Sequence, residues 1–548
     1  MSRNCSPRIL MSMGNKEMNS VKQMNSTSQM NSIAAVLQHW ATITPNAALL
    51  IAPETERQLT YQDVLTQAQA LAKALHKMDV SPGAHIGLVL PNGLQTSSLF
   101  LSVMAAGYVV TPFNLLAQTE QLSWVMNHSD CAVIFYGPGQ STIVNQAARA
   151  LQRPCRLIEI DPDAQQIDFE GLTGTRSAPM GVSNNGLGTL RDSQLAVNPE
   201  QPALLMYTSG TTGIPKGVRL THQNLLHAAE SVSKWHQLTP EDRVLSSLPI
   251  YHINGQSIAT VTPFYSGGSI VCAQKFSASQ WWPTVSKYRC TWINMVPTII
   301  AYLLNASEDG RTPSRQELQS LRFGRSASAP LPPEHHRAFE ERFGVPVIEA
   351  MGMTESASVV FCNPHDSRRR YGSPGLPCGV EAKVIAPDGR TLASGETGEL
   401  CLSGANVMAA YYKAEIESAK AFDTQGWLKT GDLGFRDSDG FYFVTGRLKE
   451  LIIKGGENIA PREIDEMLLR HPAVLDAACV GIPDPNYGQE ILACIILREG
   501  EQCSESDIRE FCLEKLGRYK TPKSFQFVND LPRGPSGKVQ RLKLLELL

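Results

Sequence analysis

The sequence lacks two features: an apolar run that could cross a membrane, and a marked excess of either charge. A transmembrane helix needs roughly 18 to 20 apolar residues in a row, and no segment of the 548 residues reaches that length. Lys and Arg number 49 against 52 Asp and Glu, so the net charge is −3. Nucleic acids and anionic membranes attract basic surfaces. We therefore expect neither nucleic-acid binding nor stable membrane insertion.

Paired cysteines and a secretion signal are also missing. The twelve cysteines are scattered without a Cys-x-x-Cys pair, which argues against metal ribbons and redox dithiols. The first residues are polar, rich in Ser, Asn and Met, and have no apolar core of the kind a signal peptide requires. We expect residues 1–30 to form a disordered leader, and the protein to be cytoplasmic with reduced thiols.

The remaining chain is too long for a single compact core. Between residues 33 and 197, helical stripes alternate with short apolar strands, such as a helix over 61–78 followed by a strand over 86–90. This alternation predicts a layered α/β fold with largely parallel sheets. Turn residues between short strands at 381–403 predict a β-rich subdomain. We place a large N-terminal domain at 31–446 and a small α+β domain at 447–548.

A loop rich in glycine and hydroxyl groups follows an apolar strand at 203–206. Its candidate phosphate-binding residues are Thr208, Ser209, Gly210, Thr211, Thr212, Gly213 and Lys216. Glycines let backbone amides approach phosphate oxygens, hydroxyls add donors, and Lys216 adds positive charge. The spacing is not that of a Walker loop, because Lys216 lies between Pro215 and Gly217. An unspecialised surface loop is the alternative, but it does not explain the placed lysine, proline and strand.

Residues 208–217, followed by Leu220-Thr221-His222 and Asn224, resemble the signature of AMP-forming acyl-CoA synthetases. That superfamily also contains luciferases and the adenylation domains of peptide synthetases. The resemblance extends from about residue 33 to the C-terminus, with its motifs in the expected order. It implies an adenylation domain at 31–446, a mobile C-terminal domain at 447–548, and the cofactors ATP, Mg²⁺ and coenzyme A.

The resemblance also implies roles for residues in and beyond the phosphate loop. In the motif at 348–355, Thr354 would contact the α-phosphate and Glu355 would hold magnesium, as a metal bridging phosphates requires. Met351, before Gly352, replaces the usual tyrosine beneath adenine, which a polarizable thioether can also contact. The remaining nucleotide-binding residues would be Ser328, Ala329 and Pro330 beside adenine, Asp432 at the ribose, and Arg447 as its companion. Taken singly, such residues are more often structural, and the stretch at 328–330 also suits a packed strand–turn.

The C-terminal domain carries the remaining implied roles. Lys538, framed by prolines and glycines, would balance charge during adenylation. Lys449 matches the hinge between the domains. After rotation of the small domain, Gly455 and Gly456 would line the tunnel that admits the thiol of coenzyme A. The same resemblance implies two steps: the acid attacks the α-phosphate of ATP with loss of pyrophosphate, and the thiol then displaces AMP.

The acid itself is assigned from two candidate residues, His252 and Arg325. Arg325, in Arg-Ser-Ala-Ser-Ala, resembles the corresponding stretch of oxalyl-CoA synthetases. A guanidinium can bind a second anion bidentately, which predicts a small acid such as oxalate, malonate or sulfoacetate. Alternatively, Arg325 pairs with a protein carboxylate in a fatty-acyl or crotonobetaine-type enzyme. His252 is either an acid contact or a structural histidine. Other rivals are a free-standing adenylation protein that loads a carrier thiol and a nucleotide-binding pseudoenzyme.

Overall fold

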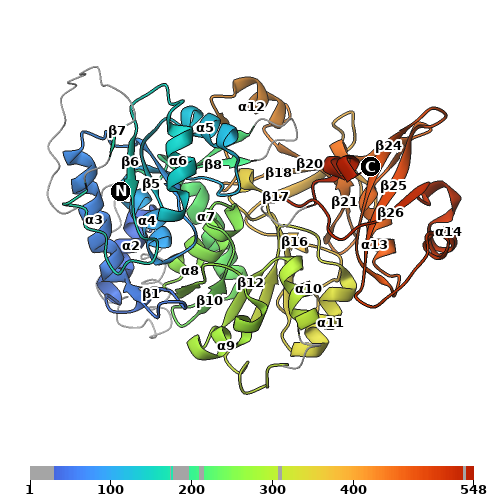
Figure 1. Cartoon of the computed structure of the whole chain (residues 1–548), viewed down its shortest axis with the longest axis horizontal. Coiled ribbons are helices and arrows are strands. Elements are labelled where there is room, and N and C mark those ends of the chain that lie inside the picture. The colour runs from blue at the N-terminus through green and yellow to red at the C-terminus, as the bar shows by residue number, and fades with distance from the viewer. Residues whose placement is uncertain are drawn as a thin grey trace, which may run out of the picture.

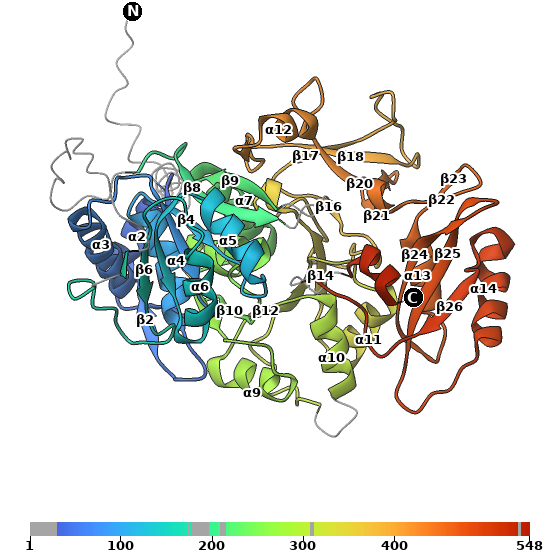
Figure 2. The same cartoon turned by 45° about the horizontal axis from the view of Figure 1, so that its top comes forward.

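The computed structural model describes residues 30–172, 175–176, 197–208, 215–306, 312–534 and 539–547. Outside this range lie most of the predicted leader, five residues of the phosphate loop (Ser209, Gly210, Thr211, Thr212 and Gly213) and Lys538, so their roles stay predictions. Within it, the strands form four sheets. Two large α/β layers lie side by side, and a β-rich part with the C-terminus stands at one end (Figures 1 and 2). The predicted fold class is confirmed.

The first large sheet has the strand order β19-β9-β8-β4-β3-β5-β6-β7. Its strands are β3 (His85–Val89), β4 (Val109–Pro112), β5 (Cys131–Tyr136), β6 (Arg156–Glu159), β7 (Thr175–Arg176), β8 (Pro202–Thr208), β9 (Lys216–Thr221) and β19 (Tyr411–Tyr412). The central strands β8 to β6 are parallel. β8 and β9 are antiparallel and pair Thr208 with Lys216, so the two ends of the predicted phosphate loop are held together.

The second large sheet has the order β16-β15-β14-β13-β12-β10-β11-β1-β2. Its strands are β1 (Ala48–Ile51), β2 (Gln58–Thr60), β10 (Arg243–Ser246), β11 (Ser269–Cys272), β12 (Trp292–Met295), β13 (Phe323–Ser326), β14 (Val347–Met351), β15 (Phe361–Cys362) and β16 (Leu376–Pro377). β12, β13 and β14 are parallel, with Arg325 between Asn294 and Ile348. The carboxyl ends of parallel strands meet at one edge, where ligands bind in such sheets. The segments after β13 and β14 therefore meet there.

Helices cover these sheets and separate them (Figure 1). They are α2 (Ile33–Ile43), α3 (Tyr61–Lys77), α4 (Leu94–Ala105), α5 (Thr119–His128), α6 (Ser141–Ala148), α7 (His222–His236), α8 (Thr262–Tyr265), α9 (Ala278–Tyr288), α10 (Pro297–Ala306) and α11 (Pro333–Phe343). α3 begins where predicted, because Thr60 and Asp63 form a capping box. Every residue of α4 is buried, as in a helix covered on all sides. A π-helical stretch, η3 (Asn254–Val261), is likewise buried.

A small antiparallel sheet links the large layers to the C-terminal part. It consists of β17 (Glu381–Ile385), β18 (Gly398–Ser403), β20 (Leu428–Arg436) and β21 (Tyr442–Arg447), and α12 (Glu415–Ala421) precedes β20. β17 and β18 pair antiparallel as the turn residues between them predict. The antiparallel pairing of β20 with β21 places Asp432 opposite Arg447.

The C-terminal part has its own sheet and core. The sheet contains β22 (Ile452–Lys454), β23 (Glu457–Ile459), β24 (Val474–Asp484), β25 (Gly488–Leu497) and β26 (Ser524–Phe527), with helices α13 (Pro461–Leu468) and α14 (Glu505–Lys520). One core cluster, which includes Ile464, Ile491 and Ile508, draws its buried residues from this part alone. The boundary at 446 and 447 stays a prediction. Over the residues with described structure, no helix has the length and apolarity needed to traverse a membrane.

Candidate active site

A cavity of about 420 Å³ lies between segments of the second large sheet, the small antiparallel sheet and the C-terminal part. Seven of the predicted nucleotide-binding residues line it: Ser328, Ala329, Pro330, Met351, Gly352, Asp432 and Arg447. They come from four separate stretches of the chain, namely the segment after β13, the end of β14, and the strands β20 and β21. The fold thus gathers residues that the sequence analysis assigned to one ligand.

The ribose-binding candidate Asp432 lies in the wall of this cavity and is 3% exposed. Arg447 reaches it across the β20–β21 pair, with 2.7 Å between the Arg447 Nε and the Asp432 Oδ1. The other carboxylate oxygen, Oδ2, has no hydrogen-bond partner among the described atoms. A buried acceptor without a donor costs about 1–3 kcal/mol. A hydroxyl group of a bound ribose would supply that donor.

Two backbone constraints shape the adenine side of the cavity. Ser328 adopts a left-handed conformation with φ of +74°, and its Oγ accepts a hydrogen bond from Asn254 Nδ2 at 3.1 Å. At Gly352, an added Cβ would lie 1.8 Å from the Ser358 carbonyl oxygen, so only glycine fits there. Met351 is half-buried beside Gly352 and lines the cavity. Its contact with adenine stays a prediction.

The predicted metal-binding and phosphate-binding groups meet at a residue that the sequence analysis missed, Tyr411. Thr354 and Glu355 form a 3₁₀ turn, η4 (Thr354–Ser356), directly after β14. The Tyr411 hydroxyl donates to Glu355 Oε1 at 2.8 Å. The ammonium of Lys216 lies 4.9 Å from the centre of the Tyr411 ring. Glu355 and Lys216 are therefore neighbours in the fold, as a shared polyphosphate ligand requires.

Glu349 is a second residue that the sequence analysis missed. It lines the cavity, is 3% exposed, and accepts a hydrogen bond from the Leu331 amide at 3.1 Å through Oε1. Oε2 has no partner among the described atoms. Burial raises the pKa of Glu349 to about 7. A buried strand residue two positions before Met351 carries no sequence signal beyond its acidity, which explains the omission.

Replacing Glu349 with glutamine is expected to stabilise the protein at alkaline pH. Because burial raises the pKa of this carboxyl from 4.5 to about 7, its ionisation destabilises the fold. This destabilisation is absent below about pH 4.5 and complete above about pH 7. Glu349→Gln should therefore raise the melting temperature by several degrees at pH 8 and by much less at pH 5, measured by scanning calorimetry. An equal gain at both pH values would contradict this assignment.

The acid-side candidate Arg325 is fully buried on β13. Its Nη1 donates to Asn254 Oδ1 at 3.3 Å, and the same oxygen accepts from Asn294 Nδ2 at 3.1 Å. The Nε and Nη2 atoms have no hydrogen-bond partner of good geometry among the described atoms, and the buried thiols of Cys362 and Cys378 lie close to the guanidinium. Burial lowers the pKa of Arg325 from its ordinary value. No carboxylate in the described part of the chain pairs with it, so the alternative of a protein ion pair has no support there.

His252 precedes η3 and packs against Tyr251, with 4.9 Å between the ring centres. It is half-buried. It does not line the 420 Å³ cavity. Asn254, two residues later, connects this segment to both Arg325 and Ser328. The structure therefore brings the segment of His252 and Asn254 next to the segment of Arg325 and Ser328. The role of His252 itself stays a prediction.

The C-terminal part presents the neighbourhood of Lys538 to the cavity. Arg533 and Val539, which flank the segment containing Lys538, both line the cavity and form an isolated antiparallel bridge. Lys449 lies in the short turn η5 (Leu448–Glu450), immediately after β21. Gly455 and Gly456 have left-handed φ values of +55° and +88° in the β22–β23 turn and do not line the cavity. Their roles as hinge and tunnel stay predictions.

Comparison with known proteins identifies the family. The AMP-binding enzyme family matches residues 37–412, and the C-terminal domain of AMP-binding enzymes matches residues 463–538. The chain belongs to the AMP-binding enzyme family. The resemblance to AMP-forming acyl-CoA synthetases and the predicted class, an AMP-forming acid–CoA ligase, are confirmed. The predicted use of ATP and coenzyme A agrees with this family.

Among the relatives of this AMP-binding enzyme, a sulfoacetate–CoA ligase of Cupriavidus necator is 48% identical over 514 residues, which cover 94% of this chain and 97% of that protein. An oxalate–CoA ligase of Arabidopsis thaliana is 32% identical, with 86% of this chain and 90% of that protein covered. The crystal structure of ATP-bound MatB from Rhodopseudomonas palustris is similar with a TM-score of 0.81 at 26% identity, and the match covers 93% of this chain and 98% of MatB.

Proposed function

We propose that this AMP-binding enzyme converts a small acid with a second strong anion, of the sulfoacetate type, into its CoA thioester through an acyl-adenylate. The observation that carries the proposal is the buried guanidinium of Arg325, whose Nε and Nη2 lack partners among the described atoms. The similarity to a sulfoacetate–CoA ligase supports the same substrate class. A sulfonate and a carboxylate both offer two oxygens to a guanidinium edge.

The electrostatics of the Arg325 site favour an anionic substrate. Burying an unpaired charge is costly, and the oxygen that accepts from the guanidinium belongs to a neutral side chain, Asn254. A substrate anion at Nε and Nη2 would form a charge-assisted pair in a site of low dielectric, where such pairs are strong. Binding of such an anion would thus offset part of the free energy lost on burying Arg325.

The surroundings of Arg325 also bear on the length of the acid. On the same strand, Phe323 stacks on Trp292 with 5.7 Å between ring centres, and both rings are fully buried. His236, at the end of α7, packs 5.1 Å from Phe323. These aromatic side chains form a packed cluster around the strand that carries Arg325. A short acid is consistent with this packing.

The residues described around the ATP site suit a magnesium ion that binds together with the nucleotide. No group of three His, Cys, Asp or Glu side chains capable of holding a metal occurs among the residues with described structure. Magnesium is commonly held by one or two carboxylates plus substrate phosphates. The Glu355 carboxylate, next to the Thr354 hydroxyl, fits that role. When bound, the ion would neutralise phosphate charge.

In the proposed adenylation step, different residues bind the ribose, the phosphates and the acid. Asp432 accepts hydrogen bonds from the ribose, and Thr354 and Lys216 bind phosphate oxygens. Arg325 orients the acid so that its reacting carboxylate faces the α-phosphate. This orientation converts an encounter of two anions into an ordered in-line attack.

We also propose a cytoplasmic enzyme, because the eleven cysteines in the described part of the chain are free thiols and ten of them are buried.

The test is a comparison of acids in the full reaction with ATP and coenzyme A. We expect kcat/KM for sulfoacetate, malonate and oxalate to exceed that for propionate, butyrate and octanoate, with sulfoacetate the best of the panel. Acyl-CoA should form without any added carrier protein. A preference for octanoate would exclude the small dianion, and a requirement for a carrier would favour an adenylation protein. Absence of pyrophosphate exchange with every acid would indicate a pseudoenzyme.

A further inference from the structure

We propose that Tyr411 is a positioning residue for the ATP half of the site: its hydroxyl orients the metal-binding carboxylate of Glu355, and its ring orients the ammonium of Lys216. Two observations carry the proposal, the 2.8 Å hydrogen bond from the hydroxyl to Glu355 Oε1 and the 4.9 Å approach of Lys216 Nζ to the ring centre. The proposal rests on the roles proposed above for Glu355 and Lys216, and it does not depend on which acid the enzyme uses.

The hydrogen bond from the Tyr411 hydroxyl orients the Glu355 carboxylate and leaves its other oxygen available to a metal. A carboxylate that ligates a metal is usually held by a donor to its other oxygen, and loss of that donor lowers metal affinity about 10- to 100-fold. Tyr411 supplies such a donor through Oε1. The Tyr411 hydroxyl is the donor in this bond, because an ionised carboxylate can only accept. The Met408 amide also donates to the Glu355 backbone carbonyl at 2.7 Å, which fixes the backbone beside the carboxylate.

The ring contact places Lys216 at the exit of the phosphate loop. An ammonium over an aromatic face gains about 0.5–1 kcal/mol at exposed sites and more when desolvated. β19 pairs antiparallel with β9, so that Tyr411 lies opposite Val218 and Tyr412 opposite Gly217. The ring is therefore fixed relative to the strand that begins at Lys216. Without it, the flexible lysine stem would sample many rotamers.

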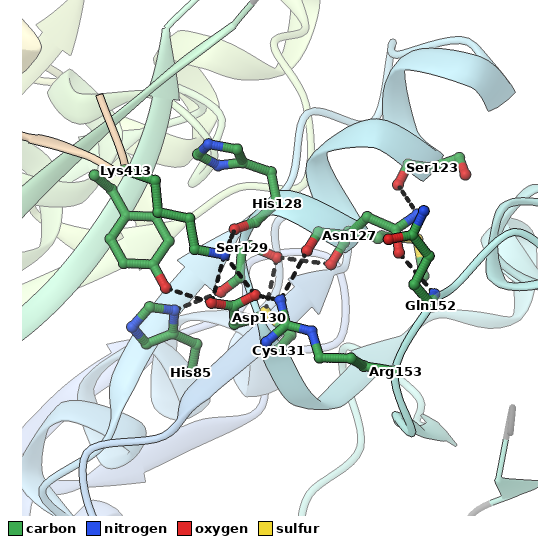
Figure 3. Close-up of polar contacts among 12 residues, drawn as sticks. His85, Ser123, Asn127, His128, Ser129, Asp130, Cys131, Gln152, Arg153 and Lys413 are labelled. Atoms are coloured by element: carbon green, nitrogen blue, oxygen red, sulfur yellow. Dashed lines mark hydrogen bonds and ion pairs between the residues drawn. The ribbon is translucent and has the colours of Figure 1, made fainter. Parts of the chain in front are cut away.

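A separate cluster anchors the two-residue strand β19 from outside the ATP site. The Tyr412 hydroxyl donates to Asp130 Oδ2 at 2.6 Å, and Lys413 Nζ donates to Asp130 Oδ1 at 2.7 Å. Lys413 also donates to the His128 carbonyl at 3.1 Å. Arg153 pairs with the same Asp130 carboxylate, as Figure 3 shows. Asp130 thus ties β19 to the turn between α5 and β5, which lies further along the same sheet, and so helps to fix Tyr411.

The test separates the two contacts of Tyr411 by comparing two variants, Tyr411→Phe and Tyr411→Leu. Tyr411→Phe keeps the ring under Lys216 and removes the donor to Glu355, so the Mg²⁺ concentration for half-maximal activity should rise about tenfold. ATP binding without Mg²⁺, measured by calorimetry in EDTA, should stay unchanged. Tyr411→Leu removes both contacts and should weaken ATP binding in EDTA as well. Tyr288→Phe, distant from the site on α9, is the matched control and should match the wild type.

A loss of folding in Tyr411→Phe would be distinguished from the loss of one hydrogen bond by the melting temperature. The melting temperature of ligand-free Tyr411→Phe should stay within a degree or two of that of the wild type, because the ring and its packing remain. An unchanged Mg²⁺ requirement in Tyr411→Phe would overturn the proposal. Equal weakening of ATP binding with and without Mg²⁺ in that variant would overturn it too. The calorimetric measurements of ATP binding, with and without Mg²⁺, use no acid, so they are independent of the proposed substrate class.

Discussion

Exchanging Lys538 for alanine is expected to slow acyl-adenylate formation about a thousandfold, the effect of removing one group that stabilises developing charge. Thioester formation from supplied acyl-adenylate should stay nearly unchanged, because the resemblance assigns Lys538 to the first step only. The measurements are ATP–pyrophosphate exchange for the first step and release of AMP from synthetic acyl-adenylate for the second. Equal losses in both steps would contradict a lysine that serves adenylation alone.

The structure supports this prediction through the residues that flank Lys538. Arg533 and Val539 line the cavity that also contains Asp432. Beyond them, Arg541 donates to the Cys479 carbonyl at 2.9 Å and pairs with Asp465 at 2.5 Å, which holds the following segment against the C-terminal sheet. The ends of the segment that contains Lys538 are thus held at the cavity wall.

Two further variants sharpen the test of Lys538. Lys543→Ala removes an exposed lysine from the same C-terminal stretch, and both steps should remain at wild-type rates. Gly456→Trp should show the opposite pattern to Lys538→Ala, with thioester formation slowed and adenylation retained, because Gly456 belongs to the predicted tunnel and not to the cavity lining. An added Cβ at Gly456 meets no atom within 4 Å, but the φ of +88° strains any other residue there, so the melting temperature of Gly456→Trp is measured alongside its rates.

The sequence predicted those parts of the site that lie in contiguous motifs. Asp432 and Arg447 were assigned because they match the motifs of AMP-forming acyl-CoA synthetases in the expected order, and the structure places them opposite one another on adjacent strands. Helix and strand positions such as α3 and β3 followed from apolar periodicity and capping, which are local properties. Tyr411 was missed because its contacts with Glu355 and Lys216 depend on the pairing of β19 with β9. No local pattern encodes that pairing.

The direction of Arg325 was also beyond sequence reasoning. Its neighbours in the sheet are Asn294 and Ile348, which belong to strands separated from it by long stretches of chain. Strand alternation allows a side chain to point to either face of a sheet, and only the assembled layers decide which face is buried. In the structure Arg325 is fully buried against Asn254. Arg325 does not line the 420 Å³ cavity, and its candidacy as an anion receptor rests on the two nitrogens without a hydrogen-bond partner among the described atoms.

Replacing Arg325 with leucine is expected to lower kcat/KM for sulfoacetate on the order of a hundredfold while sparing butyrate and propionate. Hydrogen bonds to charged groups contribute about 1.5–3 kcal/mol, and only the dianion uses them. The Arg325→Leu substitution would also remove a buried cation with two unpaired nitrogens among the described atoms, so the melting temperature should stay equal or rise. Asn254→Asp keeps Arg325 but places a carboxylate against it, and should lower dianion activity in the same way. Loss of all acids together, with a lower melting temperature, would show that Arg325 supports the fold and does not select the substrate.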